Sequence, residues 1–522
     1  MAVMKLPPNY EENTRNQLIK EECPAMLLAI FNFVFLPMVQ HLMQDLDSEF
    51  KGKRGPKAYP RALLLIVVLY CFSEDINKYK SIANECKKNK FLIIILEGKT
   101  PTRGTFANFL NKSDHEIVHR VFVSTLIILN EMNALSIARV FIDGTDILIR
   151  GSRHYYIKQK DLKAMDLLNE WNLLHDGSPG KINKTLKELN IKLKEYEDNE
   201  ETFKLIKSAI RRIKIHKTIV YNKKHRYLKE FEKRGDVKLS IIFPESVYFK
   251  TKKQNFDFGF NLQAVMTDKH LIFTSILLAQ ANDQKVFEDI FNQIKRTLCI
   301  FLEMQCMYGT RTNFLFFINA FLNIIIVADA GYFTVKNLYF VFIKRINAVI
   351  MPNTEARKAN DKLRAQNGKN KKEPSQKDKF FKRVKGGYSC KNKRFLKLMD
   401  IIGIKHRKPE NNDLPNVCIT KRHIYKRKHC EDCPFFDECP KKVEDRIPFL
   451  FRWMTEKFLD LRHRVHYSLR FSRSEGVNGF HKNDDGIIKF VGTTPNAVNN
   501  ELDFRNCIYH LTRIDTLKEE GY

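Results

Sequence analysis

Two aspartates directly follow apolar, β-rich runs of the sequence. Asp143 comes after residues 137–142, and Asp329 comes after the fully apolar run 324–328. Both runs predict buried strands, and the ligand sites of open sheets form where strands end. A single aspartate in such a place is more simply explained as a turn former or a helix N-cap. Because both Asp143 and Asp329 follow a predicted buried strand, the sequence favours one acidic site that contains the two side chains.

A third acid, Glu475, lies in the segment SLRFSRSEGVNGFHK. Three carboxylates from separate elements can hold two divalent metal ions about 4 Å apart. Carboxylate oxygens suit Mg²⁺, which keeps part of its water and takes phosphate oxygens as further ligands. Asp143, Asp329 and Glu475 are therefore candidate ligands of a magnesium site. The alternative acids, should one of these be wrong, are Asp146, Glu456, Asp460, Asp484 and Asp485.

The charge of the chain indicates what such a site would act on. The 522 residues include 90 Lys and Arg against 60 Asp and Glu, a net charge of +30. An excess of this size indicates a polyanionic partner, either nucleic acid or an anionic membrane. The basic segments 204–234 and 353–409 are candidate DNA-contacting arms, with a merely solvated surface as the alternative. Asn261 and Gln263 alternate with apolar neighbours on a predicted strand and are interpreted as structural rather than DNA-reading.

Cys430, Cys433 and Cys439 form a C-x2-C-x5-C cluster. The two-residue spacing lets two thiolates bind one tetrahedral zinc ion, so the cluster predicts a structural zinc site. A closed site needs a fourth ligand, and the spacing does not decide among Cys418, His423, His429 and Cys390. A loop with reduced, partly buried thiols is the alternative.

The eleven cysteines are odd in number and otherwise scattered, which is typical of a reducing compartment rather than of a disulfide framework. The first 20 residues are polar and charged and lack the apolar centre of a signal peptide. The apolar stretches 25–43 and 314–328 are interrupted by polar residues and are interpreted as buried core elements, not membrane spans. A cytoplasmic, nucleoid-associated protein is expected.

The elements that must position these residues begin with a helical region. Short helices are predicted at residues 15–50 (broken at Pro37), 61–72, 81–92 and after 100, where Thr100 and Pro101 resemble a helix start. With the basic lead-in 51–59, they suit a helix-turn-helix-like DNA reader. A helical cap on the next domain explains the same pattern equally well.

The rest of the chain predicts a mixed α/β core with two insertions. Strands are expected at residues 137–142, 246–250, 260–266, 324–328 and 341–351, and helices at 284–298, within 451–483, and at 496–511. Residues 155–235 are charged, helical in pattern and almost free of Gly and Pro, which predicts an inserted helical hairpin.

Several segments, in order, resemble the DDE transposases of bacterial insertion sequences, in particular the IS1182 group of the IS4/IS5-like transposases. The similar segments are KGKRGPKAYPRALLLIVVLY, TPTRGTFANFL, FIDGTDI, GFNLQAVMTDKHLI, ANDQ, VADAGYF, VIMPN, HCEDCPFFDEC and RSEGVNGFHK. The resemblance implies an RNase H-like α/β catalytic core. It implies an N-terminal domain over residues 1–120, a core made of 121–154, 236–352 and 445–522, a basic helical insertion at 155–235 and a basic insertion with the Cys cluster at 353–444.

The resemblance also implies residue roles. Asp143, Asp329 and Glu475 would be the catalytic metal ligands for Mg²⁺, with Mn²⁺ as a substitute. The family often shows Tyr, Arg, Glu and Lys at fixed steps, and Tyr467, Arg470, Glu475 and Lys482 follow that order. Lys482 and Arg470 would bind DNA.

One step departs from the family pattern. The spacing from Arg470 to Glu475 is one residue longer than the family shows, so Arg473 competes with Arg470 for the DNA-binding role.

The expected function is metal-dependent cleavage of double-stranded DNA at element ends and strand transfer into target DNA by a homodimer or higher oligomer. Two alternatives share these features: a catalytically inactive, transposase-derived DNA-binding protein, and a metal-dependent nuclease without strand transfer.

Overall fold

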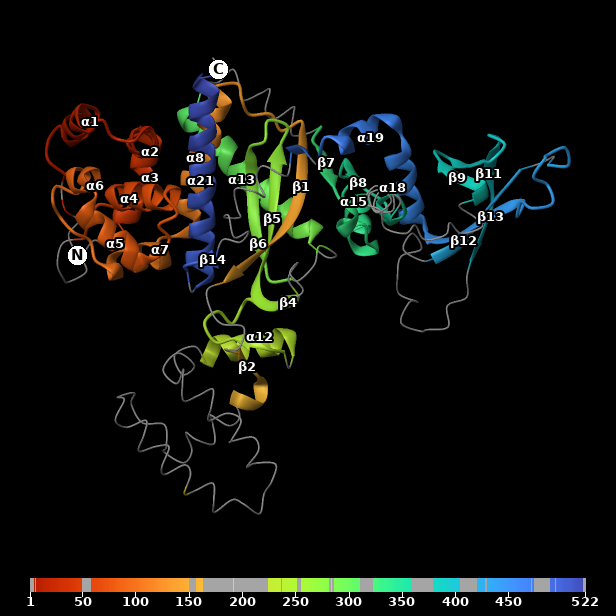
Figure 1. Cartoon of the computed structure of the whole chain (residues 1–522), viewed down its shortest axis with the longest axis horizontal. Helices are drawn as coiled ribbons and strands as arrows, with labels where there is room; N and C mark the ends of the chain where they lie inside the picture. The colour runs from red at the N-terminus through yellow and green to blue at the C-terminus, as the bar shows by residue number, and fades with distance from the viewer. Residues whose placement is uncertain are drawn as a thin grey trace.

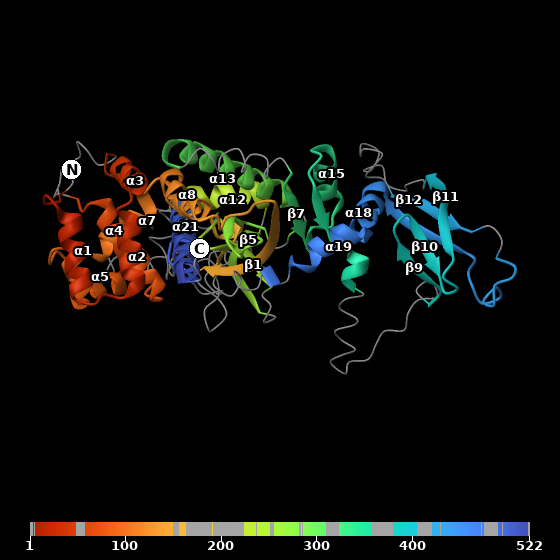
Figure 2. The same cartoon turned by 90° about the horizontal axis from the view of Figure 1, so that it is seen from above.

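The computed structural model shows a mixed α/β chain with helices at its N-terminal end, a central sheet, and a second small sheet at the far end (Figures 1 and 2). The structure describes residues 4, 6–48, 58–149, 156–162, 191, 224–235, 237–250, 255–280, 283, 286–309, 323–357, 379–403, 420–427, 430–470, 472–473, 489–492 and 494–519. Most of the predicted insertion 155–235 therefore lies outside the described residues, whereas more than half of the predicted insertion 353–444 is described.

Eight helices fill the described N-terminal region. They are α1 (Tyr10–Lys20), α2 (Ala25–Val34), α3 (Pro37–Ser48), α4 (Arg61–Ser73), α5 (Tyr79–Lys88), α6 (Lys90–Ile95), α7 (Arg103–Lys112) and α8 (His115–Glu131). The predicted buried helix is confirmed, since α4 is buried from Arg61 to Phe72. The predicted helix at 81–92 is wrong as one element, because the Asn89 side chain accepts hydrogen bonds from the Phe91 and Leu92 N–H groups and starts a new helix.

The predicted start of the next helix is displaced by two residues. Thr102, not Thr100, is the N-cap of α7: its side chain accepts from the Thr105 N–H, and Thr105 reciprocates. This reciprocal pair forms a capping box, which satisfies two N–H groups that would otherwise lack partners.

No single helix among the described residues is long and apolar enough to cross a membrane. Helices α2 and α3 pass such a test only together, and the chain bends by 70° between them. Their apolar faces pack into the protein core, where Leu27, Ile30 and Val39 are fully buried.

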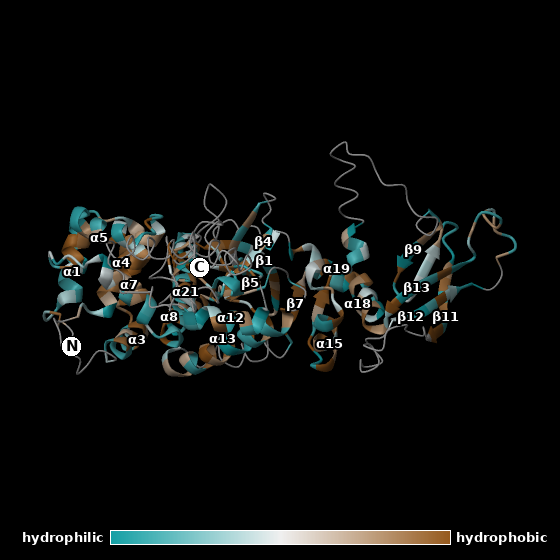
Figure 3. Cartoon of the chain, turned by 90° about the horizontal axis from the view of Figure 1, so that it is seen from below, coloured by the Kyte–Doolittle hydropathy of each residue, from teal (hydrophilic) through white to brown (hydrophobic). Residues whose placement is uncertain are grey.

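The central sheet has the order β4-β5-β1-β7-β8, with β6 paired to β5 and β14 paired to β1. Its strands are β1 (Arg139–Ile149), β4 (Val247–Lys250), β5 (Phe256–Thr267), β6 (Ile272–Leu278), β7 (Ile325–Ala328), β8 (Ala348–Ile350) and β14 (Lys489–Phe490). Strand β5 is antiparallel to β1, whereas β7 is parallel to β1 and β8 is parallel to β7. Figure 3 shows the hydrophobic residues of β7, as expected of a strand inside a sheet.

Two strand predictions need correction. Strand β1 does not end before Asp143 but continues to Ile149, because Ile147 and Ile149 bury in a second apolar cluster with Phe258 and Phe260. The predicted strand 341–351 is instead the end of helix α15 (Val335–Ile343) followed by β8. The Thr334 side chain accepts from the Asn337 N–H and so begins that helix.

Two long helices join the sheet to the N-terminal helices. Helices α13 (Phe287–Tyr308) and α21 (Pro495–Glu519) both contact α8, and α21 also contacts β6 (Figure 1). One continuous cluster of buried apolar residues runs from Tyr10 in α1 to Leu517 in α21. In its packing, therefore, the helical region caps the sheet; whether it also reads DNA stays a prediction.

The remaining described pieces are small. Helix α12 (Lys224–Arg234) packs near the two-stranded pair of β2 (Tyr156–Ile157) and β3 (Leu239–Ser240). A five-stranded antiparallel sheet has the order β13-β12-β11-β10-β9. It comprises β9 (Phe381–Val384), β10 (Gly387–Cys390), β11 (Phe395–Gly403), β12 (Thr420–Lys426) and β13 (Lys442–Pro448), and leads into α18 (Phe449–Leu459) and α19 (Leu461–Ser468).

Candidate active site

The two predicted aspartates are brought together by neighbouring parallel strands. Phe141 of β1 pairs with Val327 of β7. Asp143 and Asp329 each lie two residues further along, so they stand at the same level of the sheet. Asp329 follows the end of β7, as predicted, and its carboxylate accepts from the Gly331 N–H at 2.8 Å. Asp143 lies inside β1 and accepts from the Gly144 N–H at 3.1 Å.

One arginine joins these two carboxylates. Arg470 Nη2 lies 2.5 Å from Asp143 Oδ1 and 3.4 Å from Asp329 Oδ2. Its Nε donates to the Ile142 carbonyl at 3.3 Å. Arg470 is only 9% exposed, so the contact is shielded from water, and charges attract each other more strongly in such a low-dielectric environment than in water. The structure thus holds a cation between the two acids that the sequence predicts to bind one.

Burial and repulsion from neighbouring acids affect the protonation of Asp329. Burial raises the pKa of Asp329 above its ordinary value, and the neighbouring charges of Asp143 and Asp283 add to that rise. The Arg470 guanidinium and the Gly331 N–H work in the opposite direction without reversing it. Burial alone would lower the pKa of Arg470, but Asp143 and Asp329 raise it, so the guanidinium stays charged.

A third acid, Asp283, approaches Asp329 from another side. Asn261 Nδ2 and Gln263 Nε2 donate to Asp283 Oδ1 at 2.9 and 2.7 Å. The Tyr332 hydroxyl donates to Gln263 Oε1. This buried polar network ties β5 to the loop after β7. Asn261 and Gln263 are therefore structural, as predicted, and the side chain that they bind is Asp283 of the candidate site.

Two glycines let the acids come close. A Cβ atom at Gly331 would lie 3.0 Å from both Asp283 Oδ2 and Asp329 Oδ1. A Cβ atom at Gly144 would lie 2.6 Å from Gln263 Nε2 and 2.8 Å from Asp283 Oδ1. A Cβ at Gly144 would force the Gln263 and Asp283 side chains to move, and one at Gly331 would require the two carboxylates to give by a few tenths of an ångström. Asp283 belongs to the ANDQ segment, which resembles the family, but the sequence alone assigns no role to this aspartate.

The other predicted site residues fall in different places. Arg473 contacts the His270 ring, and Tyr467, whose pKa is raised by burial, lies beside Arg470. Glu475 and Lys482 lie outside the described residues. Asp146 is three residues beyond Asp143 on β1, so its side chain points to the face opposite that of Asp143, the face that it shares with its β5 partner Asn261.

The remaining alternative acids do not join this site within the described residues. Glu456 pairs with Arg383 at 3.6 Å, and Asp460 pairs with Lys385 at 2.6 Å, both at the junction with the five-stranded sheet. Asp484 and Asp485 lie outside the part of the chain that the structure describes.

Across the described ranges, no three His, Cys, Asp or Glu side chains are close enough together to hold a metal ion. At the candidate site, the position between Asp143 and Asp329 is taken by the Arg470 guanidinium. A pair of carboxylates that share one cation fits the donor set that Mg²⁺ prefers.

Comparison with protein-family models, with curated proteins and with solved structures finds no match to this chain. The assignment to a family therefore stays a prediction from the resembling segments, and the site must be judged on its own geometry.

We expect binding of a divalent cation at this site to increase as the pH rises through the pKa of Asp329. The carboxylate binds cations only when deprotonated, and burial moves that step above its ordinary value of 3.8. Because Arg470 lowers this pKa, Arg470→Gln should move the midpoint of Mn²⁺ binding, measured by electron paramagnetic resonance, to higher pH. Arg473→Gln, which alters an arginine next to His270, should leave the midpoint unchanged. An unshifted midpoint in Arg470→Gln would exclude this electrostatic coupling.

Proposed function

We propose that this protein is a DDE transposase that cleaves element-end DNA and transfers the strand into target DNA. The observation that carries the proposal is the Asp143–Arg470–Asp329 contact on adjacent parallel strands of the central sheet. A mixed sheet with helices packed against it supports an RNase H-like core. The net charge of +30 supports double-stranded DNA as the partner.

Magnesium fits the donors that the structure brings together. Asp143 and Asp329 would hold the ion, and Glu475 is the third ligand by resemblance. When bound, Mg²⁺ activates the attacking water or 3′-hydroxyl and stabilises the departing oxygen. Mn²⁺, with similar oxygen coordination, should substitute for it.

The chain itself contributes position and charge. Arg470 offsets the repulsion between Asp143 and Asp329 and so keeps two buried acids side by side. A guanidinium also forms paired hydrogen bonds with phosphate, so the same side chain can turn from the carboxylates to a DNA backbone. The Asn261–Gln263–Asp283 network is joined to the loop after Asp329 through the Tyr332 hydroxyl, which donates to Gln263, and so helps to keep the Asp329 carboxylate in place.

The proposal is tested with purified protein and labelled DNA that carries the ends flanking its gene. We expect cleaved ends and joined products in Mg²⁺. Binding without cleavage would support the inactive DNA-binding alternative, and cleavage without joined products would support the nuclease. Inverted repeats on both sides of the coding gene would supply the correct substrate.

A further inference from the structure

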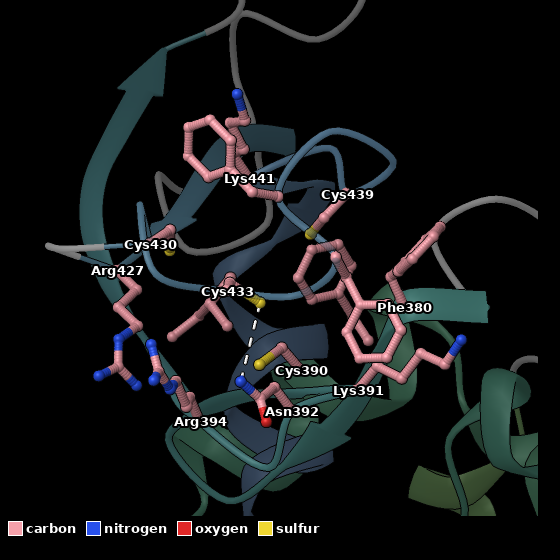
Figure 4. A pocket seen from close by; sticks show the side chains of 14 residues that line it. Phe380, Cys390, Lys391, Asn392, Arg394, Arg427, Cys430, Cys433, Cys439 and Lys441 are labelled. Carbon is pink, nitrogen blue, oxygen red and sulfur yellow. Dashed lines mark hydrogen bonds between the residues drawn. The ribbon is translucent and has the colours of Figure 1, made fainter.

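Four cysteines from two separate turns meet at one end of the five-stranded sheet. Cys390 ends β10, while Cys430, Cys433 and Cys439 lie in the connection between β12 and β13. These turns come together because β11 lies between β10 and β12 and runs antiparallel to both. All four side chains line one cavity of about 30 Å³ (Figure 4).

Tight turns present the sulfur atoms. The Cys433 N–H donates to the Cys430 carbonyl at 3.1 Å, and the Phe436 N–H donates to the Cys433 carbonyl at 2.9 Å. In the other turn the Lys393 N–H donates to the Cys390 carbonyl at 2.8 Å. The Asn392 amide donates to Cys433 Sγ at 3.8 Å, as amides do around metal-bound thiolates.

The surroundings suit a negatively charged cluster. Lys391, Arg394, Arg427 and Lys441 line the same cavity as the sulfurs. Within the described residues, the buried Arg427 Nε has no hydrogen-bond partner. A metal bound by four thiolates is anionic, and these nearby cations would balance its charge.

The small sheet also needs a source of stability besides its own core. Its described apolar cluster contains only five buried residues: Phe381, Tyr388, Leu396, Tyr425 and Val443. Units with so small a core are usually stabilised by a metal or by disulfides, and these cysteines are free.

We propose that Cys390, Cys430, Cys433 and Cys439 bind one structural zinc ion. Of the earlier alternatives for the fourth ligand, Cys390 lines the cavity and His423 does not, while residues 418 and 429 lie outside the described residues.

The chemistry of the four ligands favours zinc. Four thiolates in a tetrahedron select zinc or iron–sulfur chemistry, and the metal analysis below distinguishes the two. The sulfurs do not yet converge in the structure, where no three metal-binding groups among the described residues are close enough together. Closure therefore requires rotation of the cysteine side chains, with the turns kept. This site is independent of the proposed transposase activity.

The test is metal analysis of the full chain purified without chelator. We expect about one zinc per chain, and its loss in Cys390→Ser. Cys299→Ser, at an exposed cysteine of α13, is the matched control and should keep the zinc. Zinc absent from folded wild type, retained in Cys390→Ser, or replaced by iron would each overturn the proposal.

A second measurement on the wild-type protein tests the site even if the cysteine variants fold poorly. Wild-type protein loaded with Co²⁺ instead of zinc should show the intense visible bands of a tetrahedral site and sulfur-to-cobalt charge transfer. A titration that ends at one Co²⁺ per chain with this spectrum supports four thiolate ligands. A pale, octahedral spectrum would contradict them.

Discussion

Asp329→Asn should abolish end cleavage and strand joining together, by more than about 100-fold, while leaving DNA binding intact. The amide keeps the size of the carboxylate but removes the negative charge that anchors Mg²⁺. Even residues that only support metal ligands change activity 10- to 100-fold when replaced, so a ligand should have a larger effect. DNA binding should survive, or strengthen slightly, because a repulsion with the phosphate backbone is removed. Gel-based cleavage and joining assays on labelled ends, with a parallel binding assay, measure both effects.

Two aspartates of β1, Asp143 and Asp146, provide a matched pair of variants for this prediction. Asp143→Asn should behave like Asp329→Asn, because both carboxylates contact Arg470. Asp146→Asn, on the opposite face of β1, should keep its activity. Active Asp143→Asn together with inactive Asp146→Asn would place the first metal ligand at Asp146. Glu475→Gln should be inactive by resemblance.

DNA affinity should fall steeply with salt. A protein that neutralises about 6–10 phosphates loses about 10³- to 10⁵-fold in affinity between 50 and 200 mM salt, and a chain with a charge of +30 should fall in this range. Removal of residues 353–409, or neutralisation of the basic residues in 204–234, should weaken binding and flatten that dependence. Fluorescence anisotropy over a salt series measures the slope.

The salt-dependence prediction can be made for individual residues on α12, which belongs to the basic segment 204–234. Lys229 and Lys233 are exposed on α12 and stand four residues apart, so they share one helix face. Lys229→Gln with Lys233→Gln should reduce the slope of log affinity against log salt by about 2. Lys295→Gln on α13 should leave it unchanged. If Lys295→Gln lowers the slope by as much for each charge removed, the total charge of the protein and not the α12 face determines DNA binding.

Elements with a strong local pattern could be predicted from the sequence. The continuous apolar run of α4 and the β-rich run of β7 need no knowledge of their neighbours, and both predictions are confirmed. Asp329 was placed correctly for the same reason. The extent of β1 was not, because it depends on the distant strand β5, whose Phe258 and Phe260 bury the far half of β1.

The same distinction applies to the sites. The C-x2-C spacing is visible along the chain, but Cys390 joins it only through the pairing of β10, β11 and β12. The role of Asp283 was likewise not visible in the sequence, since its partners Asn261 and Gln263 lie 22 and 20 residues earlier, on strand β5. The contacts of Arg470 with Asp143 and Asp329 also depend on the fold and could not be predicted from spacing. Sequence spacing raised Arg473 as a rival, and the structure places Arg470 at the acids.

The most direct test of the metal-dependent site is one reaction of wild-type protein with labelled element ends in four cation conditions. In Mg²⁺ and Mn²⁺ we expect cleaved ends and joined products. In Ca²⁺, whose coordination is longer and looser, and in chelator, we expect binding without chemistry. Equal cleavage with and without divalent cation would contradict a site built on Asp143 and Asp329, as would DNA binding without cleavage in both Mg²⁺ and Mn²⁺.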